Sequence, residues 1–281
     1  MERISSYRNH KKSLLLRLAV YAGAAVTVCT LLFMLTYILV NGIPNMNRSL
    51  FSLRYNSENV SVFPALVNTL VLTGIALLVA VPLGVFSAVY LEEYAGKGNR
   101  FVKVVRLTTE TLTGIPSIVY GLFGMLLFTG TLRWGYSILS GAFTVAIMIL
   151  PVIMRTTEEA LIAVPEIYRE GSYGLGAGKL RTVFRIILPT AMPGILSGVI
   201  LATGRIVGET AALIYTAGTV AAIPSSLMGS GRTLAIHMYI LSSEGLHTAQ
   251  AYASAVVLLI LVVIINMISS FLAKKMTLGQ K

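Results

Sequence analysis

The sequence predicts an all-α membrane protein with six transmembrane helices. Its 281 residues are 56% hydrophobic and only 12% charged, with a mean hydropathy of +0.80. Soluble domains carry about 25% charged residues, so this composition is typical of a polytopic membrane protein. Six long apolar runs, and a strongly uneven distribution of lysine and arginine between them, favour the same fold class.

The net charge is +11, and the sequence contains no aspartate. In a membrane protein an excess of positive charge indicates basic cytoplasmic loops, so we expect no nucleic-acid partner. The single cysteine, Cys29, lies within an apolar run, which excludes an internal disulfide. The three histidines, His10, His237 and His247, share no metal-ligand spacing, so no metal site is expected.

A bilayer-spanning helix needs about 20 apolar residues, and the six runs are read as spans on that basis. The first run follows a basic start but exceeds the about 7–15 apolar residues of a signal peptide, so we expect a retained anchor helix. The third is interrupted at 114–117, where Gly114 and Pro116 should kink or unwind the helix, either as a hinge or path lining or as a buried kink. The expected spans are 14–40, 65–91, 107–129, 136–154, 191–217 and 252–273.

The lysine and arginine residues orient these spans. Six spans place both termini on one side. With that side in the cytoplasm, 17 of the 22 basic residues are cytoplasmic and Arg205 is within the membrane. Only Arg48, Arg54, Arg133 and Arg232 lie outside. This asymmetry predicts cytoplasmic termini and a cytoplasmic loop at 156–189.

The loop at 156–189 has the pattern of a docking element. Apolar residues recur at helical spacing before Pro165 and Gly171 break the pattern. Tyr173 and Leu175 are expected at the tip of the resulting helix–turn–helix. Exposed apolar groups with a charged rim are what a partner groove binds. The rim is expected to consist of Arg169, Glu170 and Lys179.

At this loop the chain resembles the importer permeases of the ABC class. Their motif, Glu-Ala-Ala, three residues, Gly, nine residues, Ile-x-Leu-Pro, is matched by Glu170-Gly171-Ser172, Gly176 and the residues 186–189. Gly171 and Ser172 replace the two alanines, and both are small enough to keep close packing. The resemblance implies a type I importer permease fold in which residues 65–281 form the permease domain. Residues 1–64 then form an N-terminal tail, the first helix and an external loop.

The same resemblance implies that this loop forms a cytoplasmic coupling helix that docks on a separate ATPase subunit. Its expected contacts are Glu170, Gly171, Ser172, Tyr173 and Gly176. The glycines at 174–178 followed by Lys179 do not form a P-loop, because Tyr173 occupies the first glycine position and Leu180 follows the lysine. We therefore expect no cofactor in this chain, with ATP and Mg²⁺ bound by the partner.

Arg205 and Glu209 lie within the fifth predicted span, one helical turn apart. A charge at such depth costs about 2.5–3.5 kcal/mol on insertion scales, whereas an i,i+4 pair returns only about 0.2–0.5 kcal/mol. Mutual neutralisation would explain how the charges are tolerated but not why they are present. An arginine that faces a water-filled path is also a bidentate site for an oxyanion.

The stretch 204–218, which contains both charges, closely resembles the permeases of the high-affinity phosphate importer, the Pst system. The modest loop at 41–64 and the short basic end at 274–281 resemble the A-type permease more than its C-type partner. The resemblance implies that Arg205 and Glu209 are required for phosphate passage. Arg155 matches a further arginine of the family, or is a cytoplasmic anchor.

The resemblance also implies an inner-membrane location and four kinds of partner: a homologous second permease, an ATPase dimer, an external phosphate-binding protein and membrane lipid. One alternative is a permease for sulfate, molybdate or phosphonate. Another is an intramembrane enzyme using Glu209 as a base, which is disfavoured because the spans hold no second catalytic group. A transport subunit without enzymatic activity is therefore expected.

Overall fold

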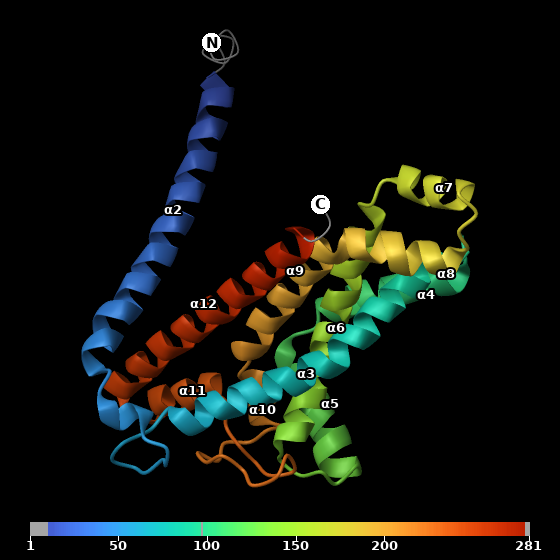
Figure 1. The fold of residues 1–281 in the computed structure, drawn as a ribbon. Coiled ribbons are helices and arrows are strands. Elements are labelled where there is room, and N and C mark those ends of the chain that lie inside the picture. The colour runs from blue at the N-terminus through green and yellow to red at the C-terminus, as the bar shows by residue number, and fades with distance from the viewer. Residues whose placement is uncertain (1–10, 97, 279–281) are drawn as a thin grey trace.

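The computed structural model describes residues 11–96 and 98–278, with side chains at 14–96 and 98–271, and in this part of the chain it is helical without strands (Figure 1). Five segments are long and apolar enough to cross a membrane: Leu14–Asn45, Phe63–Tyr94, Ile138–Ile162, Lys179–Val207 and Thr248–Phe271. A bent pair of helices supplies a sixth. The prediction of an all-α protein with six spans is confirmed when this bent pair is counted as one span.

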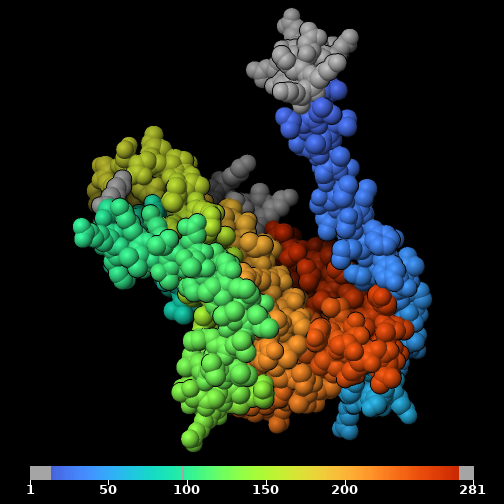
Figure 2. Space-filling model, turned by 180° about the vertical axis from the view of Figure 1, so that it is seen from behind, coloured from blue at the N-terminus to red at the C-terminus, as the bar shows by residue number. Residues whose placement is uncertain are grey.

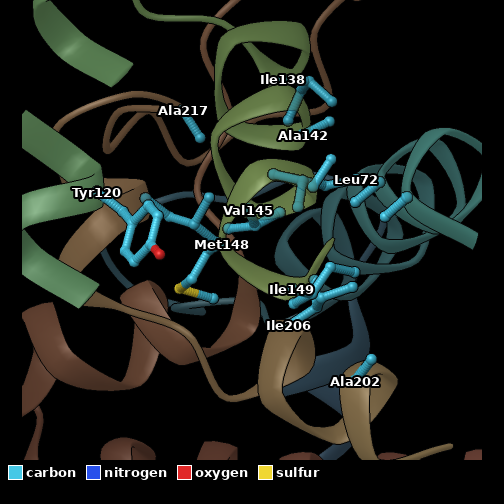
Figure 3. Packing of buried hydrophobic residues seen from close by; sticks show 14 of the residues in the cluster. Leu72, Tyr120, Ile138, Ala142, Val145, Met148, Ile149, Ala202, Ile206 and Ala217 are labelled. Carbon is cyan, nitrogen blue, oxygen red and sulfur yellow. The ribbon is translucent and has the colours of Figure 1, made fainter. Parts of the chain in front are cut away.

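The bundle is built around α6 (Ile138–Ile162), which packs against both α3 (Phe63–Val89) and α9 (Leu188–Val207). Small and branched side chains make this possible, because they let the helices approach closely in an apolar surrounding. Figure 3 shows Val145 and Ile149 of α6 in one cluster with Leu72 of α3 and Ile206 of α9. All four are fully buried or nearly so.

The remaining long helices lie at the side of this core. α12 (Thr248–Leu278) packs against α9, and α2 (Lys11–Gly42) packs against α12. The contact of α2 lies near its C-terminal end, where Gly42 meets the backbone of Tyr252. The rest of α2 stands apart from the bundle, as Figure 2 shows, and its side chains from Leu14 to Tyr37 are exposed. An apolar helix with this exposure requires lipid or a partner subunit around it.

The third span is broken where the sequence predicted a break. α4 (Arg100–Thr113) and α5 (Ser117–Gly124) meet at an angle of 103°, and the residues between them include Gly114 and Pro116. A π-helical segment, η5 (Met125–Thr131), continues α5. The start of α4 lies seven residues before the expected position 107, because Asn99 caps it by accepting a hydrogen bond from the Phe101 N–H at 2.9 Å.

The fourth and fifth spans differ from their predicted bounds. α6 continues through Ile162, past the expected end at 154, so the first residues of the expected loop are helical. The helix that includes α9 begins earlier, with α8 (Lys179–Thr182) and the π-helical η6 (Val183–Ile187), and ends at Val207 instead of 217. Gly208 closes it by donating a backbone hydrogen bond to the Gly204 carbonyl at 3.2 Å. Hydropathy could not locate this end, because the chain stays apolar beyond it.

Beyond α9 the chain forms the short α10 (Ala211–Ile214), a loop and α11 (Leu234–Glu244), which the sequence analysis did not predict. In Figure 1 this loop and the loop at 43–62 lie at one end of the bundle. The N-terminal end of α2, the C-terminal end of α12 and the helix α7 (Glu166–Gly174) lie at the other end. The loop at 156–189 therefore shares an end of the molecule with both ends of the described chain.

Candidate functional site: a coupling helix and an arginine path

The predicted coupling loop contains α7, which begins directly after Pro165 and ends in a turn. The Ala177 N–H donates to the Ser172 carbonyl at 3.1 Å, which closes the turn. Gly176 within it has φ of +81°, a conformation that L residues with a side chain rarely adopt. This positive φ explains why glycine occupies position 176.

The tip of this loop presents apolar side chains to solvent. Leu175 is 91% exposed and Ile167 is 70% exposed, and Tyr168 and Tyr173 are also exposed beside Glu170. Nothing within the described chain covers this surface, and it forms a continuous part of α7 and its turn. An exposed apolar patch of this kind is typical of a protein–protein contact.

The two small residues of the motif have different surroundings. Ser172 is buried, and its hydroxyl hydrogen-bonds that of Thr182 on α8 at 2.8 Å, which holds α7 against α8. Gly171 faces open space, because an added Cβ would meet no atom within 4 Å. Of the two residues, Ser172 therefore packs closely within this chain, and close packing at Gly171 stays a prediction for the contact with a partner.

Arg169 was expected on the exposed rim, and this is also wrong. Its residue exposure is only 9%, and its guanidinium binds Glu93 at the end of α3, with N–O distances of 2.7 and 3.2 Å. Burial lowers the pKa of Arg169, but the hydrogen bond and charge of Glu93 and the charge of Glu166 outweigh it, so the pKa lies above its ordinary value. The side chain faces inward because Glu93 offers it a buried carboxylate.

Arg155 lies on α6, near the end of the bundle that carries α7. It pairs with Glu159 one turn later at 3.0 Å, and both side chains are more than half exposed. The two line a hollow of about 290 Å³ together with Arg106, Glu110 and Glu158. Arg155 thus sits in an open, strongly charged recess.

Arg205 and Glu209 do not form the ion pair that one continuous helix would allow. Arg205 is in the last turn of α9, but Glu209 follows the helix end at Gly208, so the two are not related by a helical turn. Glu209 is 8% exposed, and its carboxylate accepts a hydrogen bond from the Ala212 N–H at 3.0 Å, at the start of α10. Within the described residues Arg205 has no ion pair or hydrogen-bonded side-chain partner. Mutual neutralisation is therefore wrong for this conformation.

Arg155 and Arg205 lie on two helices, α6 and α9, that pack against each other. Thr156 of α6, next to Arg155, lies directly against Gly198 of α9. Arg205 is seven residues beyond Gly198, which is about 10 Å along a helix at 1.5 Å per residue. Arg155 and Arg205 therefore lie at different depths of the same pair, with Arg155 nearer to the end that carries α7.

Sequence reasoning did not single out Glu93 or Arg106, two residues that shape this region. Arg106 of α4 pairs with Glu92 at 3.0 Å and also with Glu158. The adjacent carboxylates Glu92 and Glu93 at the end of an apolar run indicate that basic side chains lie nearby, because acids at that position need cations as partners. Their partners come from separate helices, and the sequence alone does not identify them.

Comparison with known proteins matches this chain and its fold to one family. Residues 80–278 match the family model described as the binding-protein-dependent transport system inner membrane component. A probable ABC transporter permease protein, YqgI of Bacillus subtilis, is 32% identical over 90% of this chain and 94% of its own length. The phosphate transport system permease protein PstA 1 of Mycobacterium tuberculosis H37Rv is 39% identical over 75% of this chain and 69% of its own.

Other relatives and solved structures agree. PstA of Haemophilus influenzae is 33% identical over 75% of this chain and 74% of its own length. A bacterial ABC transporter involved in the import of alginate shares the fold with a TM-score of 0.61 and 17% identity, over 94% of this chain and 98% of that one. An inward-facing methionine ABC transporter matches with a TM-score of 0.58 and 19% identity, over 76% and 94%. The chain has the type I importer permease fold and belongs to the binding-protein-dependent inner-membrane components of ABC transporters, and within them to the PstA-type permeases, which are transport subunits and not enzymes.

Proposed function

We propose that this chain is the A-type permease of an ATP-driven importer of inorganic phosphate, and that Arg205 contacts the phosphate in transit. The observation that carries the proposal is the state of Arg205. A cation near the end of an apolar helix, partly exposed and without a carboxylate partner in the described chain, needs an anion or water to satisfy it. A guanidinium can bind a phosphate through two parallel N–H donors.

The path runs along the α6–α9 pair and has two positions that bind phosphate. Arg205 forms the outer position (the outer station) and Arg155 forms the inner one (the inner station). At the inner station Glu159 already pairs with Arg155, so an arriving anion competes with a carboxylate. Such competition keeps binding weak, and a transport site must release what it admits. The exposed face of this pair is closed by a homologous second permease, so that the two chains together line the path.

Energy enters through the apolar surface at Ile167, Tyr168, Tyr173 and Leu175, which docks with Glu170 and Gly176 on an ATPase dimer that binds ATP and Mg²⁺. The segment Lys179–Val207 begins beside this surface and ends just beyond Arg205. At 1.5 Å per residue, the 26 residues from Lys179 to Arg205 would span about 39 Å if helical throughout. A displacement of the coupling loop can therefore reach the outer station through one helical segment.

The proposal also includes the orientation of the chain in the membrane. The termini and α7 face the cytoplasm of the inner membrane, where their lysines and arginines agree with the positive-inside rule. The loops at 43–62 and 219–233 face outward and receive an external phosphate-binding protein. Lipid surrounds the exposed length of α2 where no subunit does.

The experiment is uptake of radiolabelled phosphate by the complete importer, with unlabelled anions as competitors. We expect unlabelled phosphate to abolish the signal, and a hundredfold excess of sulfate, molybdate or phosphonate to leave it unchanged. Competition by sulfate or molybdate as strong as that by phosphate would contradict phosphate as the substrate and favour another oxyanion. The relatives named PstA support phosphate over these alternatives.

A further inference from the structure

The end of α3 is a π-helical turn, η4 (Tyr90–Tyr94), with two adjacent glutamates that reach different helices. Glu92 binds Arg106 of α4 at 3.0 Å. Glu93 binds Arg169 of α7 at 2.7 Å. A π-turn often marks a functional site, because its extra residue changes the direction of the side chains that follow. Here it places consecutive carboxylates on different partners.

Arg169 uses all five of its N–H donors. Nε and one Nη bond Glu93, and the remaining bonds go to the Leu161 carbonyl at the end of α6, the Val164 carbonyl in the connection to α7, and Glu166. Glu93 is only 8% exposed, so this ion pair is shielded from solvent and salt. One side chain therefore ties α7 to the ends of both α3 and α6.

A second contact connects the same two regions. The ammonium group of Lys179, at the start of α8, lies 5.3 Å from the centre of the Tyr94 ring, within the range of a cation–π interaction. The turn η4 is thus held by the loop at Glu93 and at Tyr94. The chain connects α7 directly to α6 and to α8, but no short loop connects α7 to α3. The contacts at Glu93 and Tyr94 therefore link α7 to the end of α3.

The apolar contacts of this region would not transmit a force as well as the ion pair. Val89, Leu161, Val164 and Val183 form a buried cluster here, and its apolar contacts are non-directional. In the ion pair, Nε and one Nη of Arg169 both donate to the same Glu93 oxygen, Oε1, and these charge-assisted hydrogen bonds are directional. Because a buried pair often gives no net stability over apolar side chains of similar volume, stability alone is a weak reason for its presence.

We propose that Arg169 and Glu93 are positioning residues that lock the coupling helix α7 to α3, so that both move as one body when the ATPase acts. This rests on the proposed function, in which α7 receives the ATPase. Without the lock, α7 would still dock and ATP would still be hydrolysed, but the displacement would reach α3 only through its apolar packing on α6 and α9. The transport path would then fail to open in step with hydrolysis.

The first test compares phosphate transported per ATP hydrolysed in reconstituted complexes. The double variant Glu93→Leu with Arg169→Met replaces the pair by apolar groups of similar volume, so folding should survive. We expect ATP hydrolysis near the wild-type rate, and a fall in phosphate per ATP of about tenfold or more, within the range of coupling effects between sites. Glu166→Gln is the matched control, since it removes only the exposed partner of Arg169, and it should leave the ratio unchanged.

An unchanged ratio in the double variant overturns the proposal, as does a parallel loss of uptake and hydrolysis in an assembled complex. If the double variant does not assemble, Arg169→Lys, which keeps the positive charge but cannot make the five hydrogen bonds of the guanidinium, is measured by the same criteria.

The second test does not depend on the substrate. Spin labels at Glu166→Cys on α7 and Tyr90→Cys on η4, in a Cys29→Ser background, report the distance between the two elements. We expect the same distance distribution in the nucleotide-free and ATP-trapped states of the otherwise wild-type complex, and different distributions in the double variant. A distance that already changes without the double substitution overturns the lock. If phosphate is not transported but the distance stays fixed, the substrate is wrong and the lock stands.

Discussion

The contact between α6 and α9 leads to a prediction whose size follows from the geometry. Gly198 of α9 faces Thr156 of α6, and a Cβ added at Gly198 would lie 2.6 Å from the Thr156 Cβ. A side-chain rotation cannot relieve this contact, because Cβ does not move with χ1. To reach the ordinary limit of 3.4 Å, the helices must separate by about 0.8 Å. Overpacking of this kind costs about 1–3 kcal/mol.

The assay is thermal unfolding of the purified permease complex in detergent, with membrane abundance as a second readout. Gly198→Ala should lower the midpoint by several degrees, since about 1 kcal/mol shifts the midpoint of a protein of this size by about 2–4 °C. The double variant Gly198→Ala with Thr156→Gly, which moves the small residue to the other helix, should recover part of the loss.

A matched control is available in α3. Gly74→Ala adds a Cβ that meets no atom within 4 Å of this chain, so its unfolding midpoint should stay the same or rise slightly. The reasoning is refuted if Gly198→Ala and Gly74→Ala have the same effect. That result would mean that α6 and α9 are not in close contact at Gly198.

Two further predictions concern orientation and coupling. Cysteines introduced at Asn56 and Ser242 should react with an impermeant thiol reagent added outside, and one at Ala177 should not; labelling of Ala177 from outside would reverse the topology. Gly176→Leu should cost the isolated chain only the strain of its positive φ, about 1–2 kcal/mol, because no atom lies within 4 Å of the added Cβ. The same variant should uncouple ATP hydrolysis from uptake in the complex, and near-normal uptake in cells would show that the loop is an ordinary connector.

The parts of the fold that local chemistry determines could be predicted from the sequence. Six apolar runs gave the number of spans, and Gly114 with Pro116 gave the position of the 103° break. In each case the signal lies within a few residues of the feature it predicts.

The errors arose where a distant contact or a subtle helix end decides the structure. The helical turn between Arg205 and Glu209 was assumed because the run is apolar throughout, yet the helix ends at Gly208 between them. Arg169 was placed on the surface because it is charged, yet its partner Glu93 lies 76 residues earlier in the chain. Neither outcome follows from composition or periodicity.

Phosphate uptake by variants of Arg205 tests most directly whether this residue lies on the phosphate path. Arg205→Gln alone, and Arg205→Gln with Glu209→Gln, are compared with the wild type by radiolabelled phosphate uptake normalised to the amount of complex in the membrane. Arg205 has no carboxylate partner in the described chain. Removing the charge of Glu209 as well should therefore not rescue the Arg205→Gln variant. We predict that both variants assemble and hydrolyse ATP but import no phosphate. A double variant that imports phosphate like the wild type would contradict the claim that Arg205 lies on the phosphate path.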